Sequence, residues 1–123
     1  MPHAPRLPLN TLTGFSSPGP LRSKRRKPDV TAPGAMIISA LSADSSPDDP
    51  DFLVADRKQV VEAGTSMASP FVAGTVALLL QSNPNLTPEA VKVKLKAASR
   101  IPGKSAGAFA IDWGFGLLDG NRL

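Results

Sequence analysis

The change from a strand-like to a helix-like pattern near residue 64 constrains the fold more than any other feature. Residues 59–63 form a short β-branched segment typical of a strand, and Gly64-Thr65-Ser66 follows directly. After this point apolar residues recur at helical spacing, with small residues between them. The pattern predicts a buried helix of about 15 residues that is apolar nearly all round and carries Pro70 in its first turn. The larger apolar residues are Met67, Val72, Val76, Leu79 and Leu80.

A second helix is predicted after residue 86 by a complete set of start signals. Thr87 can act as the N-cap, Pro88 fits the first helical position, and Glu89 places negative charge near the positive end of the helix dipole. Residues 91–96 alternate apolar residues with lysines, which by itself would fit a strand. The start signals and an apolar stripe favour a helix whose end is marked by Gly103. The stripe is formed by Val91, Leu95 and Ala98.

The other segments are assigned from proline, glycine and charge. Residues 36–41 are a short apolar run, β-branched at its centre, and predict a buried strand. Residues 1–27 are rich in proline and are predicted to be irregular, whereas the acidic residues 42–58 predict an exposed loop. Residues 113–119 contain too much glycine for regular structure, and we expect a packed closing segment there.

Composition excludes several kinds of site. The chain has 123 residues, enough for one domain or part of one, with no cysteine and a single histidine, His3. Disulfide frameworks, thiolate metal sites, cysteine nucleophiles and multi-histidine metal sites are therefore excluded. No apolar run approaches the roughly 18 residues of a membrane span, and the first residues lack the apolar stretch of a signal peptide. We expect no membrane partner, and the sequence assigns no compartment.

Five basic residues lie between Arg22 and Lys27, in a chain of net charge +4. Such a run either contacts nucleic acid or forms a charged turn at the surface. No aromatic residue is interleaved for base stacking, so the sequence favours the turn and predicts no nucleic-acid partner. A basic nucleic-acid-binding module stays open as an alternative, and its affinity would fall steeply as salt rises.

The acidic loop holds the candidate metal ligands. Carboxylates of this kind can bind Ca²⁺, but their spacing matches no EF-hand loop, and Pro47 and Pro50 stiffen the segment. A solvated insertion is the favoured interpretation, and no metal or other cofactor is predicted. The carboxylates are Asp44, Asp48, Asp49, Asp51 and Asp56.

Ser66 is the candidate for chemistry. A serine where a strand passes into a helix has an exposed hydroxyl, and its N–H lies among the unpaired amides that can stabilise a developing oxyanion. The alternative is that Ser66 is an ordinary N-cap residue. Ala68 rules out the Gly-x-Ser-x-Gly elbow of α/β-hydrolases, and Ser69 rules out a Ser-x-x-Lys motif.

Four segments, in the same order, resemble the subtilisin-like serine proteases, or subtilases. Residues 64–74 (GTSMASPFVAG) resemble the family's nucleophile motif, although Phe71 stands where the family usually has histidine. Residues 27–34 (KPDVTAPG) resemble its strand-and-turn signature. Residues 15–20 (FSSPGP) and 114–119 (GFGLLD) resemble the segment before the last sheet strands and the closing motif.

The resemblance implies a fold and a site. The fold class would be α/β, the C-terminal part of a subtilisin-like three-layer α/β/α fold with a mostly parallel sheet. Residues 1–14 would form an irregular N-terminal segment, and residues 15–123 the C-terminal portion of the catalytic domain. Ser66 would be the nucleophile, with Thr65 and Met67 as its active-site neighbours. The parent family would act on peptide or protein substrates outside the cell, and Ca²⁺ binding in a longer protein stays open.

The family's catalytic Asp, catalytic His and oxyanion Asn have no counterpart in this sequence. Asp29 belongs to the strand-and-turn signature, His3 lies in the wrong context, and Asn10 is too close to residue 15 for the oxyanion Asn. We therefore expect the chain alone to be inactive and to need the missing N-terminal part of the catalytic domain as its partner. A non-catalytic protease remnant is the alternative. Because the neighbouring parallel strands would be missing, we also expect marginal stability or self-association.

Overall fold

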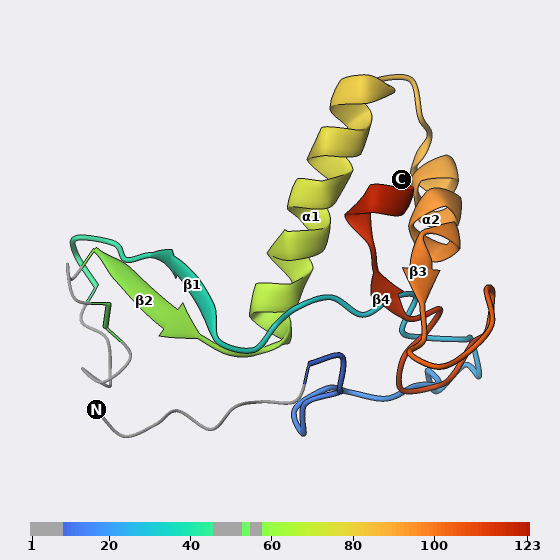
Figure 1. Ribbon diagram of the computed structural model, residues 1–123, viewed down its shortest axis with the longest axis horizontal. Helices are drawn as coiled ribbons and strands as arrows, with labels where there is room; N and C mark the ends of the chain where they lie inside the picture. The colour runs from blue at the N-terminus through green and yellow to red at the C-terminus, as the bar shows by residue number, and fades with distance from the viewer. Residues whose placement is uncertain (1–8, 46–52, 55–57) are drawn as a thin grey trace.

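The computed structural model describes residues 9–45, 53–54 and 58–123, and all structural statements concern these residues. Two helices, two small antiparallel ladders and one 3-10 turn make up the regular structure (Figure 1). In chain order they are β1 (Ile37–Ala40), β2 (Gln59–Glu62), α1 (Thr65–Ser82), α2 (Pro88–Ala97), β3 (Ser99–Arg100), β4 (Leu117–Leu118) and a 3-10 helix (Gly120–Arg122). No described helix is both long enough and apolar enough to cross a membrane.

Strands β1 and β2 pair with each other as an antiparallel hairpin, with Ile37 opposite Glu62. The hairpin extends away from α2, beyond the first turn of α1 (Figure 1). The strand predicted at residues 36–41 is confirmed as β1, but its predicted burial is wrong, because Ile38 is 60% exposed and most of β1 lies at the surface. The prediction of a strand at residues 59–63 is confirmed, and Val60 is its buried residue.

Parallel pairing is limited to one place in the described chain. Thr31 forms a parallel bridge with Leu117, while β3 and β4 pair in the antiparallel sense. Strands β1 and β2 do not belong to the parallel pairing that the resemblance implied, because they form backbone hydrogen bonds with each other in the antiparallel sense. Residues 113–119 were expected to lack regular structure, and strand β4 at Leu117–Leu118 corrects this.

Helix α1 is confirmed and longer than expected, at 18 residues. Its burial is not as predicted, because Leu79 is its one buried residue while Phe71 and Leu78 are 47% and 68% exposed. The described chain covers one side of the helix and leaves the other open. Pro70 lies in the second turn rather than the first, because the helix already begins at Thr65.

Helix α2 follows its predicted start signals closely. The Thr87 hydroxyl accepts a hydrogen bond from the Ala90 N–H at 3.2 Å, Pro88 opens the helix, and Glu89 lies in the first turn. The helix ends at Ala97, earlier than Gly103 suggested, because β3 begins two residues later.

The core lies where α1 and α2 meet the closing segment. Ser99 is fully buried just after α2, and its hydroxyl donates a hydrogen bond to the Leu95 carbonyl at 2.7 Å. Because this polar group is satisfied, it can lie among apolar side chains at little cost. The buried cluster consists of Leu79, Val91, Leu95, Ala98 and Leu118, with Val72, Val76 and Leu86 packed against it.

Candidate active site

Ser66 is the second residue of α1, directly after the hairpin. The N-cap is Gly64, which offers no side chain, and the helix begins at Thr65. The alternative that Ser66 is itself the N-cap is therefore wrong, and the predicted junction of strand and helix is confirmed. The hydroxyl of Ser66 is left without a capping role.

The hydroxyl and the backbone N–H of Ser66 have no hydrogen-bond partner within the described chain. Its side chain is exposed, and neither its hydroxyl nor its backbone N–H forms a hydrogen bond with another described residue. The Gly64 carbonyl accepts instead from the N–H groups of Met67 and Ala68, at 3.1 and 3.3 Å. The N–H of Ser66 is thus one of the unpaired donors at the positive end of the helix dipole.

Pro70 also affects the first turns of the helix. Because proline has no N–H, the Ser66 carbonyl lacks the helical hydrogen bond that residue 70 would otherwise donate. Thr65 is exposed beside Ser66, and Met67 is half-buried. Thr65, Ser66 and Met67, the three site residues of the sequence prediction, thus lie together on the first turn of α1.

Gly34 holds the start of α1 in place. The Gly64 N–H donates a hydrogen bond to the Gly34 carbonyl at 2.7 Å, which ties the helix to the segment after Pro33. A Cβ at position 34 would lie 2.7 Å from the Gly64 carbonyl oxygen and 3.1 Å from the Ala68 Cβ. Only glycine leaves room for this approach. Sequence reasoning found residues 27–34 as a motif but missed this contact, because no local pattern links positions 34 and 64.

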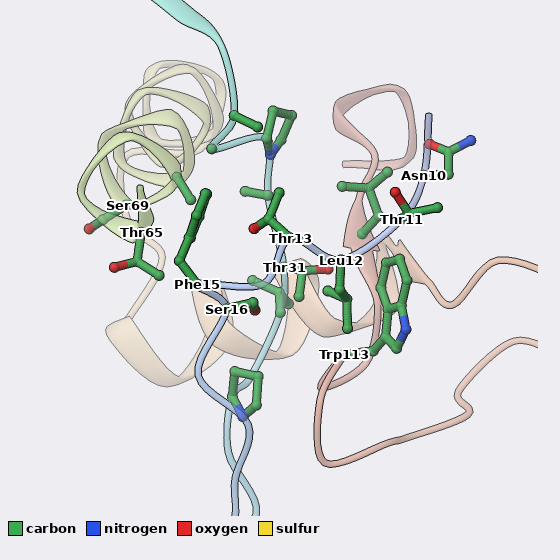
Figure 2. A pocket seen from close by; sticks show the side chains of 18 of the residues that line it. Asn10, Thr11, Leu12, Thr13, Phe15, Ser16, Thr31, Thr65, Ser69 and Trp113 are labelled. Atoms are coloured by element: carbon green, nitrogen blue, oxygen red, sulfur yellow. The ribbon is translucent and has the colours of Figure 1, made fainter. Parts of the chain in front are cut away.

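A pocket of about 790 Å³ lies against α1, but Ser66 does not line it. Thr65 and Ser69 from the helix form one side of the pocket, and Trp113 forms another (Figure 2). The helical residues on this wall repeat at the spacing of one helix face, namely Thr65, Ala68, Ser69 and Val72. Ser66 projects from a different face, so this pocket does not present a ligand to the serine hydroxyl.

No described residue hydrogen-bonds to the Ser66 hydroxyl as a general base would. The one histidine, His3, falls outside the described residues. Asn10 lines the pocket on the Trp113 side, away from Thr65 and Ser69 (Figure 2). A base and a second oxyanion donor would therefore have to come from outside the described residues.

The basic run forms a turn. Leu21 and Arg25 are joined by a backbone hydrogen bond of 3.1 Å, and the Arg26 guanidinium lies 5.3 Å from the centre of the Phe109 ring. Lys27 pairs with Asp29. The backbone hydrogen bond confirms that the basic run forms a turn.

Most of the acidic loop lies outside the described residues, so the absence of a metal site there stays a prediction. Asp44 is exposed, and the described residues contain no cluster of three potential metal ligands. The other four aspartates of the loop, Asp48, Asp49, Asp51 and Asp56, lie outside the described residues.

Comparison with known proteins shows which family this chain resembles in sequence. The sequence model of the subtilase family matches residues 8–116. Serine protease AprX of Bacillus subtilis is 46% identical over 88 residues, which are 71% of this chain and 20% of AprX. Subtilisin-like protease SBT4.4 of Arabidopsis thaliana is 43% identical over 89 residues, which are 71% of this chain and 12% of that protein.

A solved structure agrees with the sequence matches. The CspB protease of Clostridium perfringens superimposes with a TM-score of 0.67 at 30% sequence identity. The match covers 92% of this chain and 23% of the CspB chain. The α/β fold class is confirmed by this neighbour, and the chain spans about a fifth of the length of AprX and less of SBT4.4.

Proposed function

Because this chain belongs to the subtilase family, we propose that it supplies the nucleophile of a serine endopeptidase, with Ser66 as the attacking residue. The supporting observation is the state of Ser66 at the start of α1, with an exposed hydroxyl and an N–H that no other described residue uses. These are the two groups that a serine nucleophile contributes to acyl transfer.

The proposed reaction proceeds through an acyl-enzyme. The Ser66 oxygen attacks the carbonyl carbon of a peptide bond while its proton passes to a histidine supplied from outside the described residues. The negative charge that develops on the carbonyl oxygen is stabilised by the Ser66 N–H and the positive end of α1, together with an external asparagine. The histidine then protonates the leaving amine, and water hydrolyses the ester. The proposed reaction uses protein groups and one water molecule, and it needs no cofactor.

The roles proposed for the neighbours of Ser66 follow from their positions. Thr65 is exposed beside the nucleophile, where it can border a bound substrate. Met67 is half-buried in the same turn, so its oxidation to the sulfoxide would place a polar group beside the serine. For the chain alone we propose no measurable peptidase activity, because a serine without its base is a weak nucleophile.

A chimera tests the role of Ser66. Replacing the matching stretch of Bacillus subtilis AprX with this chain would restore any missing triad members, and we expect the chimera to hydrolyse a peptide substrate and to react with a fluorophosphonate probe. Ser66→Ala should reduce turnover by a factor on the order of 10⁶, as triad removal does in subtilisin, a subtilase itself.

The matched control is Ser82→Ala, the same substitution at the exposed end of the same helix, which should leave turnover unchanged. The isolated chain should remain unlabelled by the probe. Retention of labelling in the Ser66→Ala chimera would reject Ser66 as the nucleophile. Labelling of the isolated chain at the rate of the chimera would reject the proposal that it is inactive alone.

A further inference from the structure

The basic run (residues 22–27) is built on a tight turn. The Leu21 carbonyl accepts a hydrogen bond from the Lys24 N–H at 2.8 Å, and the Leu21 N–H donates to the Arg25 carbonyl at 3.1 Å. Both backbone groups of Leu21 are thus used to close the turn, and they define the backbone path between the two residues. The cations of the run are therefore carried by a folded segment rather than by a free loop.

Backbone contacts on either side hold this turn against a distant part of the chain (Figure 1). Before the turn, the Gly19 N–H donates to the Ile111 carbonyl at 2.6 Å, and after it the Phe115 N–H donates to the Asp29 carbonyl at 2.9 Å. The two arms also lie against each other, because a Cβ at position 19 would lie only 1.8 Å from the Lys27 carbonyl oxygen. The turn is thus pre-organised, and a ligand need not order it on binding.

Few negative charges balance the basic run. Asp29 is the only acidic residue among the first 43, and it pairs with Lys27 and with Lys96 of α2. The Arg26 guanidinium lies 5.3 Å from the centre of the Phe109 ring, which holds a second cation in place. The other three cations are exposed and form no ion pair with any described residue, namely Arg22, Lys24 and Arg25.

The arrangement of these three cations costs stability in the free chain. Lys24 has a φ of +60°, a left-handed backbone conformation that residues with long side chains rarely adopt. Like charges held close together on one turn also repel each other. Backbone strain of this kind is typical of sites that bind a ligand, and a bound anion would remove the repulsion. The turn is therefore suited to a ligand that carries several negative charges.

The surroundings of the run favour one class of anion. Nucleic acid would need an aromatic ring for base stacking, but the Phe109 ring is already engaged by Arg26 and, edge to face at 5.4 Å, by Phe115. A protein or membrane partner would need several apolar side chains at the contact, and Leu21 is the only large one within residues 19–27. A sulfated polysaccharide carries closely spaced anions and has no bases, and clustered arginines and lysines suit it.

We propose that the basic run is a binding site for a sulfated polysaccharide, whose sulfate groups pair with Arg22, Lys24 and Arg25. The planar guanidinium can donate two parallel hydrogen bonds to one sulfate, whereas the lysine acts as a point charge. Arg26 and Lys27 hold the turn in place through Phe109 and Asp29. The inference goes beyond the proposed function and does not depend on the role of Ser66.

Heparin immobilised on a sensor surface is the probe, with the full chain in solution at nanomolar concentration. We expect saturable binding that weakens by about tenfold or more as salt rises from about 50 to about 200 mM, because the ligand's counterions are released on binding. Heparin from which the sulfates have been removed should bind at least tenfold more weakly. Single-stranded DNA with the same number of charges should also bind about tenfold more weakly, because no ring is free to stack its bases.

Two charge variants locate the contact. Arg22→Gln combined with Arg25→Gln should weaken heparin binding about tenfold. The matched control is Lys92→Gln combined with Lys94→Gln, which removes the same charge from two exposed lysines of α2 and should change the affinity less than twofold.

A glycine variant guards against misfolding of the paired arginine variant. Lys24→Gly removes one cation and suits the left-handed backbone at that position, so the turn should be at least as stable. We expect weaker heparin binding with unchanged hydrogen exchange in α2. If the paired variant disturbs the fold, the result for Lys24→Gly decides.

Four outcomes would overturn the proposal. The first is that the chain does not bind heparin, and the second is that desulfated heparin binds equally well. The third is an equal loss of affinity in the paired variant and its control, which would show that binding follows net charge alone. The fourth is that DNA binds as tightly as heparin, which would favour the nucleic-acid interpretation of the basic run.

Discussion

At the scale of single residues, Asp29 links its own segment to helix α2 and to the closing segment. Its carboxylate pairs with Lys27 and, at 2.8 Å, with Lys96 of α2. The Lys96 ammonium also lies 5.4 Å from the centre of the Phe115 ring, a distance at which cation and ring attract each other. The carboxylate therefore fixes the segment that leads to Gly34 against α2, and the backbone carbonyl of Asp29, which accepts from the Phe115 N–H at 2.9 Å, fixes it against the closing segment.

The ion pairs of Asp29 predict a measurable pH dependence. Partial burial would raise the pKa of Asp29, but the hydrogen bonds and positive charges of Lys27 and Lys96 outweigh it and hold the pKa below the ordinary value of 3.8. Because the folded-state pKa is lowered, the stabilisation is fully present above pH 3.8 and is lost as pH falls through the folded-state value. An NMR titration of the Asp29 carboxyl group should show this lowered pKa.

Lys96→Met should raise that pKa towards 3.8 while keeping an apolar side chain of similar length. Lys92→Met is the matched control, because Lys92 is exposed on the same helix and forms no ion pair with a described residue. An Asp29 pKa that does not respond to Lys96→Met would show that the ion pair seen here is absent in solution.

At the scale of elements, the two helices depend on different interactions. Helix α2 is amphipathic, and its first turn is stabilised by the Thr87 cap and by Glu89. Helix α1 has neither a side-chain cap nor an acidic residue in its first turn. Its stability therefore depends on apolar packing, and the described chain provides this packing on one side only.

A pair of threonine substitutions tests this difference. Thr87→Ala removes the cap and should destabilise α2 by about 1 kcal/mol. Thr75→Ala removes a hydroxyl that donates to the Phe71 carbonyl within α1, a bond that the helix does not need, and the higher helix propensity of alanine should leave α1 equally or slightly more stable. Amide hydrogen exchange resolves the two helices separately. An equal loss of stability in α1 and α2 would contradict the prediction that the two helices depend on different interactions.

At the scale of the whole molecule, little of the apolar surface is buried. Seven apolar residues are buried within the described chain, whereas large apolar side chains remain exposed on α1, the hairpin and the N-terminal segment. On α1 these are Phe71 and Leu78, separated by the exposed small residues Ala73, Gly74 and Ala77. Continuous apolar patches of this kind drive association.

We therefore predict that the purified chain self-associates or melts without a sharp transition. Light scattering coupled to size exclusion should give a mass above 12.8 kDa at micromolar concentration. Leu78→Lys should shift the distribution towards the monomer, because it places charge on the open face of α1. Val93→Lys is the matched control with a smaller effect, since Val93 is equally exposed but lies between lysines on α2. A monomer that melts cooperatively would contradict the prediction.

The sequence by itself determined the two helices, the strand before Ser66 and the four motifs that resemble a subtilase. Helix caps, helical spacing and turn chemistry act between residues a few positions apart, so they can be read from the chain without knowing its fold. This is why Thr87 and the junction at Ser66 were predicted correctly.

Tertiary structure alone decided which segments pair and which apolar residues are buried. The antiparallel hairpin, the contact of Gly34 with Gly64 and the ion pair of Asp29 with Lys96 each join residues that are far apart in the sequence. The predicted burial of α1 was wrong for the same reason. An apolar helix indicates that other segments must pack against it, but only the folded chain shows how much of its surface these segments bury. The apolar surface that the described chain leaves exposed lies on the open face of α1 and in the pocket at residues 30–32.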